Sequence, residues 1–240
     1  RGGRVNKNNV IVALAAVLIV GIISGSLLLN EDFISTSTKI DPVKTVILDA
    51  GHGGFDGGAV AHDGTVEKDI NLKITSVLKE MLKSAWYKVI STRETDVSTD
   101  DVETDTIAIR KKSDLQNRLK LMKDYPDGVF VSIHLNKFTT SAAKGSQVFY
   151  NGKIEESKVL GDAIQNSIVS LLQPENTRVN KKATTSTYLL YNATIPAVLV
   201  ECGFLSNRAE LELLKDTEYQ KKMAFCCFCG IMEYFETKEK

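Results

Sequence analysis

The stretch TVILDAGHGG, residues 45–54, joins a short apolar run to a histidine and a glycine-rich loop. Two more apolar runs end in a similar way: 128–133 leads to His134, and 197–200 leads to Glu201. Strands buried on both faces lose the alternation of apolar and polar residues, so all three runs predict strands of a parallel sheet. Ligands bind at the carboxyl ends of such strands. We therefore expect the polar residues that follow the three runs to share one sheet edge.

Helical patterns separate the predicted strands. Between residues 70 and 82, apolar side chains recur at spacings of three and four, which predicts an amphipathic helix. The alternation of strands and helices predicts an α/β fold: a single domain with a mostly parallel twisted sheet and helices on both faces. The further strands expected are 87–91, 145–150 and a short one at 189–191, and the further helices expected lie within 107–123, 159–172, 208–214 and 218–235.

The segment ahead of residue 45 predicts a membrane anchor. Residues 1–9 form a basic stub, 10–29 an uncharged transmembrane helix long enough to cross about 30 Å of hydrocarbon, and 30–44 a polar tether. Because positive residues stay in the cytoplasm, the domain at 45–240 is expected on the extracytoplasmic, cell-wall side of the membrane. A cleaved signal peptide is the alternative, with small residues at 24–26, although the apolar run continues beyond them.

Composition narrows the possible partners and the role of the cysteines. The formal net charge of zero gives no electrostatic footprint for nucleic acid, so no nucleic-acid partner is expected. Cys202 lies in an apolar run, and Cys226, Cys227 and Cys229 crowd into one segment. A disulfide framework spreads its cysteines to close loops, and a structural zinc site needs paired spacings with further ligands nearby. We interpret the four cysteines as small apolar side chains, three of them on a terminal helix.

A metal site is predicted where the strands end. Glu67 follows the glycine-rich loop and opens the first amphipathic helix, so its carboxylate is expected near His52 and His134. Two histidines and one glutamate make a catalytic zinc shell with water in the fourth position. Glu201 is then free to act as the general base. Taken singly, each histidine also fits a structural role, and Glu67 fits an acidic residue favoured by the helix dipole.

Ordered sequence blocks carry a family resemblance. They include ILDAGHGG at 47–54, Glu67 with its neighbours to residue 72, 91–96, SIHLN at 132–136 and VECGFLSN at 200–207. Through these blocks, residues 45–235 resemble the zinc N-acetylmuramoyl-L-alanine amidases. The resemblance implies zinc ligation by His52, Glu67 and His134, with Glu201 as the catalytic glutamate. It also implies a substrate, peptidoglycan glycan strands with stem peptides, and cleavage of the amide between N-acetylmuramic acid and L-alanine.

The anchor-plus-domain layout resembles the spore-cortex amidases of endospore formers. In that group, peptide removal prepares muramic acid for conversion to muramic-δ-lactam and supports germination, which would place the domain in the intermembrane space where cortex is made. The loop between residues 136 and 145 is too short for the inhibitory helix of some relatives. The resemblance therefore implies another restraint, such as weak metal affinity or an activating extracytoplasmic protein partner. Trp86 and Tyr87 stand where the family often has glycine.

Other polar residues near the predicted site receive secondary roles. Arg93 and Arg118 are expected to fix loops through hydrogen bonds, and Asn136 is a candidate contact to substrate because it follows His134 by two residues. The remaining polar residues of the first loop are interpreted as loop and turn residues: Asp56, His62 and Asp63.

Two other functions remain open. One is a non-catalytic, membrane-anchored peptidoglycan-binding protein, and a free Glu201 beside a complete ligand set argues against it. The other is a different metallohydrolase of the cell wall, such as a carboxypeptidase or a deacetylase, and the ordered blocks argue against that. The products would separate them, since only an amidase releases the free stem peptide.

Overall fold

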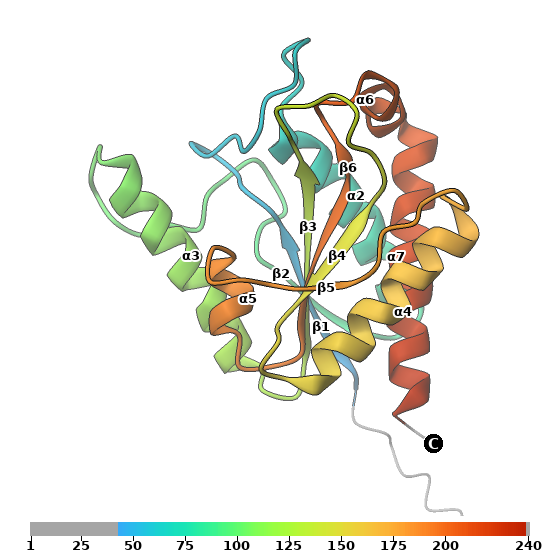
Figure 1. The fold of residues 1–240 in the computed structure, drawn as a ribbon. Helices are drawn as coiled ribbons and strands as arrows, with labels where there is room; N and C mark the ends of the chain where they lie inside the picture. The colour runs from blue at the N-terminus through green and yellow to red at the C-terminus, as the bar shows by residue number, and fades with distance from the viewer. Residues whose placement is uncertain (1–42, 239–240) are drawn as a thin grey trace, which may run out of the picture. The chain divides into compact units, whose positions relative to one another are not determined.

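A mixed six-stranded sheet in the order β2-β1-β3-β6-β4-β5 organises the chain (Figure 1). In the computed structural model, residues 43–238 are described. Four of the five strand pairings are parallel, and only β4 runs antiparallel to its neighbour β6. The strands are β1 (Thr45–Ala50), β2 (Lys88–Ser91), β3 (Val129–Asn136), β4 (Gln147–Tyr150), β5 (Lys181–Lys182) and β6 (Ala197–Phe204).

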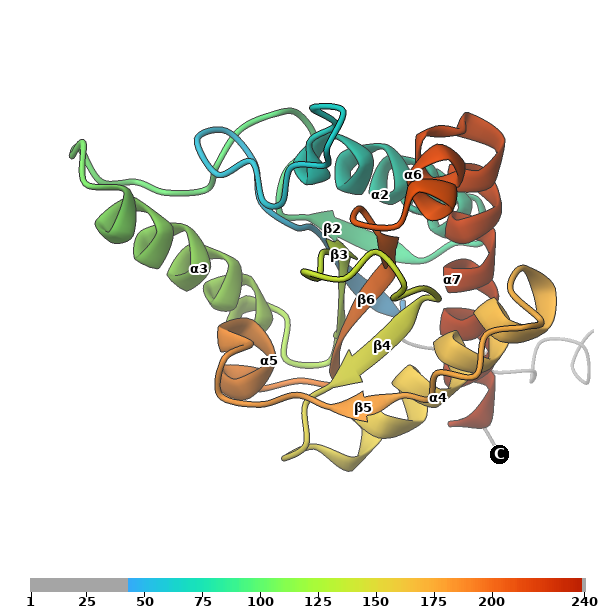
Figure 2. The ribbon, with the colours of Figure 1, turned by 45° about the horizontal axis from the view of Figure 1, so that its top comes forward.

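Helices cover both faces of the sheet, as predicted (Figure 2). On one face, α4 and α2 pack against α7, and α6 lies beside α7; on the other face lie α3 and α5. The helices are α2 (Glu67–Ser84), α3 (Ile107–Asp124), α4 (Glu155–Leu171), α5 (Tyr188–Asn192), α6 (Arg208–Lys215) and α7 (Thr217–Thr237).

Two hydrophobic cores explain why the central strands are apolar throughout. In β1, Leu48 belongs to the core under α2, α4 and α7, whereas Ile47 belongs to the core under α3 and α5. In β3, Val131 belongs to the first of these cores and Phe130 to the second. All four side chains are fully buried. A parallel sheet covered on both faces requires this, because neither face is left for polar residues.

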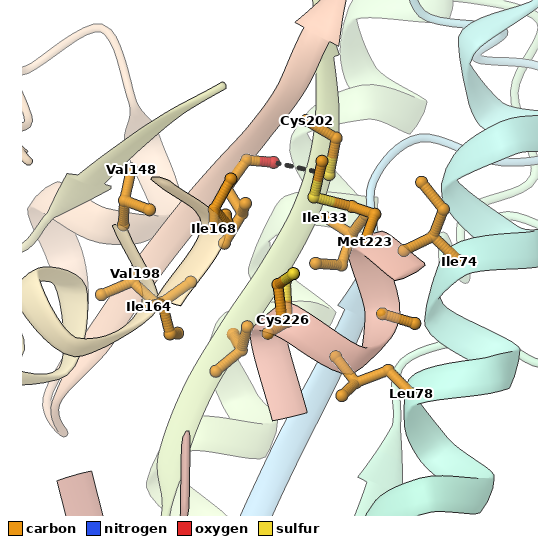
Figure 3. Close-up of a cluster of buried hydrophobic side chains, with 14 of the residues drawn as sticks. Ile74, Leu78, Ile133, Val148, Ile164, Ile168, Val198, Cys202, Met223 and Cys226 are labelled. Carbon is orange, nitrogen blue, oxygen red and sulfur yellow. Dashed lines mark hydrogen bonds between the residues drawn. The ribbon is translucent and has the colours of Figure 1, made fainter. Parts of the chain in front are cut away.

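The cysteines take part in the larger core. Cys202, Cys226 and Cys227 are buried and Cys229 is half-buried, and all four are free thiols. Figure 3 shows Cys202 and Cys226 among Ile133, Met223 and other aliphatic side chains of this core. Burial raises the pKa of the Cys226 thiol to about 11, so this thiol is protonated near neutral pH. The interpretation of these residues as small apolar side chains is confirmed for the buried three.

Two local predictions need correction. Residues 189–191, expected as a strand, lie in the helix α5, where Leu189 and Leu190 fill the core under α3. A short apolar run does not distinguish a strand from one buried helical turn, because its periodicity is too brief. The edge strand β5 (Lys181–Lys182) was not expected, since two exposed lysines carry no strand pattern.

The predicted stub and transmembrane helix at 1–29 lie outside the described residues, and so does the tether except for its last two residues. Within residues 43–238, none of the helices has the length and apolar character needed to cross a membrane.

Candidate active site

The three predicted metal ligands converge at the carboxyl edge of the sheet. His52 follows β1, His134 lies near the end of the neighbouring β3, and Glu67 is the first residue of α2. Their ligand atoms all lie within 4.8 Å of one another. Glu67 Oε1 lies 3.3 Å from His52 Nε2 and 3.0 Å from His134 Nδ1. Among the described residues, this is the single cluster of histidine, cysteine or acidic side chains with metal-ligand geometry.

Glu67 is held as a carboxylate by the surrounding backbone. Its Oε2 accepts a hydrogen bond of 2.8 Å from the Ala59 amide, and its Oε1 accepts one of 3.0 Å from the Leu135 amide. Burial raises the pKa of the Glu67 carboxyl, but its hydrogen bonds with His134 and His52 outweigh burial and hold that pKa well below its usual range. An anionic oxygen therefore faces both imidazoles at neutral pH.

His52 is positioned by Asp56, which sequence interpretation had assigned to a turn alone. Asp56 does make the turn, since its Oδ1 accepts from the Gly58 amide at 3.2 Å. Its Oδ2 also lies 2.9 Å from His52 Nδ1, which leaves Nε2 directed at Glu67. Burial lowers the pKa of His52, whereas the hydrogen bonds with Asp56 and Glu67 raise it, to about 9 overall. The carboxylates of Asp56 and Glu67 thus place negative charge on both sides of the His52 ring, and this charge would also attract a bound cation.

A strained backbone at His52 and glycines without a side chain allow the loop to pass close to these ligands. The backbone of His52 has a φ of 63°, which residues other than glycine seldom adopt. Such strained residues cluster at functional sites. A Cβ on Gly51 would lie 2.3 Å from the His134 ring, and a Cβ on Gly58 would lie 2.6 Å from Glu67 Oε2. The ligands therefore approach the backbone at places where a side chain would displace them.

Glu201 lies next to the ligand set on the neighbouring strand. In the register of β3 and β6, it is the direct partner of His134. Its Oε2 is buried and has no hydrogen-bond partner among the described residues. Burial raises the pKa of Glu201 to about 7, with repulsion from Glu67 adding to it and the two histidines opposing it. A carboxyl group with this pKa both accepts and releases a proton near neutral pH, as a general acid–base catalyst must.

Two arginines hold the loop that carries His52. Arg118 is 2% exposed, and it donates to Asp49 Oδ1 at 2.6 Å and to the His52 carbonyl at 2.7 Å. Arg93 donates to the carbonyls of Ala50 and Gly51 at 2.9 and 3.0 Å. These contacts fix the backbone between β1 and His52 and keep both guanidinium groups engaged with protein atoms.

The remaining candidates lie around the site without joining the ligand set. Asn136 ends β3 half-buried; its carbonyl accepts from the Leu205 amide at 2.8 Å, and its side chain makes no hydrogen bond with a described residue. His62 is exposed in the loop, and Asp63 pairs with Lys215 at 2.9 Å. The signal for Asp56 was present in the sequence as an acid four residues after His52, but only tertiary structure shows its carboxylate turned back to the ring.

Comparisons with known proteins agree with this geometry. The family model described as N-acetylmuramoyl-L-alanine amidase matches residues 46–233. A germination-specific N-acetylmuramoyl-L-alanine amidase of Bacillus subtilis is 38% identical over 195 residues, which cover 81% of each protein.

Solved structures agree as well. The CwlD amidase of Clostridioides difficile, solved in complex with the GerS lipoprotein, is 43% identical with a TM-score of 0.78, and the match covers 81% of this chain and 99% of that one. The amidase AmiC2 of Nostoc punctiforme is 28% identical with a TM-score of 0.68, and the match covers 80% and 97%. The family match over nearly the whole described domain establishes that the chain belongs to the N-acetylmuramoyl-L-alanine amidases.

Proposed function

We propose that this amidase uses zinc, held by His52, Glu67 and His134, to cleave the amide between N-acetylmuramic acid and L-alanine in peptidoglycan. One observation carries the proposal: three ligand atoms lie within 4.8 Å of one another, and the strand partner of His134 is a glutamate with an unpartnered buried oxygen. Two imidazole nitrogens and one carboxylate oxygen are a donor set that suits catalytic zinc and leaves a position open.

The metal and two carboxylate residues have separate roles in the proposed hydrolysis. Zinc supplies Lewis acidity, which acidifies water and polarises the amide carbonyl. Glu201 takes the proton from the attacking water and passes it to the leaving nitrogen of L-alanine. Burial of this carboxyl raises its pKa, which favours the uptake of a proton from water. Asp56 orients His52, and a carboxylate bound to a ligand histidine also increases the basicity of the ring.

The experiment compares the full chain with Glu201→Gln, which keeps the shape of the side chain and removes its basicity. Zinc content and release of free stem peptides from peptidoglycan are measured on both proteins. We expect equal zinc content, with peptide release only by the wild type. Loss of a single amino acid or of acetate in place of the stem peptide would indicate a carboxypeptidase or deacetylase. Zinc binding without any product from either protein would favour a missing activating partner or a non-catalytic binding protein.

We further propose a role in spore-cortex maturation and germination. The support is the similarity to the germination-specific amidase of B. subtilis and to C. difficile CwlD, together with the short loop between β3 and β4. A deletion strain is expected to form spores whose cortex lacks muramic-δ-lactam and which germinate poorly. A normal muramic-δ-lactam content in those spores would contradict this role.

Two parts of the proposal concern the setting of the enzyme. We propose that residues 10–29 anchor the domain with its site on the extracytoplasmic side, and fractionation of cells carrying the full chain or a form lacking 10–29 tests it. The solved CwlD structure contains a lipoprotein partner. By analogy, an extracytoplasmic protein is proposed to activate this chain, and equal activity and zinc content with and without such a protein would contradict it.

A further inference from the structure

A cavity of about 660 Å³ opens at the carboxyl edge of the sheet, the edge where the proposed metal ligands also lie. This volume suits part of a peptide, since small-ligand pockets measure roughly 300–1,000 Å³. Its walls come from the loop before Glu67, from the segment after β3 and from the segment after β6. The lining residues that matter below are Val60, His62, Lys137, Phe138, Ser206 and Arg208.

The cavity is continuous with the three segments that carry the catalytic residues. Lys137 lies three residues after His134, which is at most about 10 Å of extended backbone. Its Nζ donates to the Val60 carbonyl at 2.8 Å, and this bond joins the segment after β3 to the loop before Glu67. Because a peptide also advances about 3.5 Å per residue, a stem peptide whose first amide lies at the metal ligands reaches this cavity within about three residues.

The ionisable side chains that line the cavity are all basic. Its lining contains His62, Lys137 and Arg208 and no aspartate or glutamate. Within residues 43–238, the guanidinium group of Arg208 forms no ion pair or hydrogen bond. The acids closest in sequence are already engaged: Asp63 pairs with Lys215 at 2.9 Å, and Glu210 accepts from the amides of Gly145 and Phe204. An anionic group entering the cavity would therefore meet a free guanidinium group.

Apolar surface lies beside these cations. The Phe138 ring is 49% exposed and packs edge-on against Phe204 with ring centroids 5.0 Å apart. The Phe138 amide donates to Ser206 Oγ at 3.1 Å, which fixes the segment after β3 to the segment after β6. This wall offers a surface for the aliphatic parts of a peptide next to a site for its charge.

We propose that this cavity binds a free carboxylate of the stem peptide, with Arg208 as the principal contact and Lys137 beside it. The inference rests on the proposed amidase function and names its substrate preference. Stem peptides carry free carboxylates beyond L-alanine, and some are converted to carboxamides. A planar guanidinium group matches a carboxylate with two parallel hydrogen bonds, whereas a neutral carboxamide offers it neither the charge nor the second acceptor. The carboxylate on the second residue lies within this reach of about three residues, so Arg208 selects stem peptides in which that carboxylate is kept.

The test uses the full chain in detergent and two preparations of peptidoglycan glycan strands. Their stem peptides carry either a free carboxylate or a carboxamide on the second residue. The proteins are wild type, Arg208→Gln, Arg208→Lys and Lys120→Gln, the last of which removes one charge from an exposed position of α3 far from the cavity. Peptide release gives KM and kcat on each strand, and zinc content is measured on each protein.

For wild type and Lys120→Gln, we expect a KM about 10- to 100-fold lower on the carboxylate strands, the range set by one hydrogen-bonded charge pair. Arg208→Gln is expected to remove this difference without changing kcat or zinc content, and Arg208→Lys to restore part of it. Equal wild-type KM on both strands, or an equal loss on both strands in Arg208→Gln, would overturn the inference while leaving the amidase function intact. Release of a single amino acid or of acetate, in place of the stem peptide, by the wild type would overturn the proposed function and this inference with it.

Discussion

Replacement of Arg118 by methionine should destabilise the domain severely, because it leaves a buried carboxylate without its partner. Arg118 is 2% exposed and Asp49 is fully buried. Arg118 donates to Asp49 Oδ1 at 2.6 Å and to Asp114 Oδ2 at 2.9 Å, and two backbone carbonyls accept from it as well. Methionine fills much of the same space but supplies no donor, so each of these acceptors loses a hydrogen bond, and the carboxylates of Asp49 and Asp114 lose their cationic partner.

The expected loss is about 3–5 kcal/mol, the range for a buried ion pair from which one partner is removed. This is a large share of the roughly 5–15 kcal/mol that holds a typical domain together. Urea unfolding measures it, with far-UV circular dichroism as the probe. Fluorescence would report little, because the only tryptophan, Trp86, is 89% exposed. The midpoint should fall while the slope stays unchanged.

Two controls separate the pair from a general effect of substitution. Lys120→Met, at an exposed position of the same helix, should change stability by less than about 0.5 kcal/mol. The double variant Arg118→Met with Asp49→Asn should lose less than the sum of the single variants, since Asp49 is then no longer left as an unpaired charge. A loss below about 1 kcal/mol in Arg118→Met, or strict additivity in the double variant, would refute the role given to this pair.

Four further outcomes follow from the site. Gly51→Ala should lower zinc content measured by mass spectrometry, because its Cβ would lie 2.3 Å from the His134 ring; full zinc occupancy would contradict the packing. Asp56→Asn should weaken zinc binding about 10- to 100-fold in chelator competition, the usual cost of losing a carboxylate behind a ligand histidine. Chelation should abolish peptide release and leave the circular dichroism spectrum folded. Burial raises the pKa of Asp49, but the charge of Arg118 and the hydrogen bonds from Ser132 and Thr92 together outweigh burial and lower that pKa in the folded state. The stabilisation that results is present above about pH 4 and is lost as pH falls through the lowered value. Denaturation curves of Asp49→Asn should accordingly lack this part of the acid dependence.

The sequence predicted the central strands, and the convergence of polar side chains at their ends, because both depend on strong local patterns. The runs at 45–48 and 128–133 are too apolar to be exposed, so they predict buried strands. His134 directly follows the second run, and the end of a parallel strand predicts a position near the sheet edge. The strands β3 and β6 continue past His134 and Glu201, to Asn136 and Phe204, which the apolar pattern did not show. Polar residues at the site interrupt the pattern while the backbone pairing goes on.

What the sequence left out depends on contacts between distant segments. Asp56 carries a turn signal, and its bond to His52 arises only because the loop folds back at the strained His52 backbone. The cavity at Arg208 joins residues from three segments more than 60 positions apart, as the bond from Lys137 to Val60 illustrates. The antiparallel direction of β4 is likewise invisible in its own short apolar run.

Both ends of the domain lie at the edge of the sheet opposite the candidate active site. Thr45 begins β1 at the edge opposite His52, about 20 Å away for a strand of this length. The end of α7 lies at that same far edge (Figure 1). Near that end, the Lys44 ammonium group lies 5.5 Å from the centroid of the Phe235 ring. Attachment of the domain to a bead or surface through either end would therefore leave the proposed metal ligands and the basic cavity facing outward. That orientation matters for a substrate that is itself an insoluble network, because such a substrate cannot diffuse around the enzyme to find a covered site.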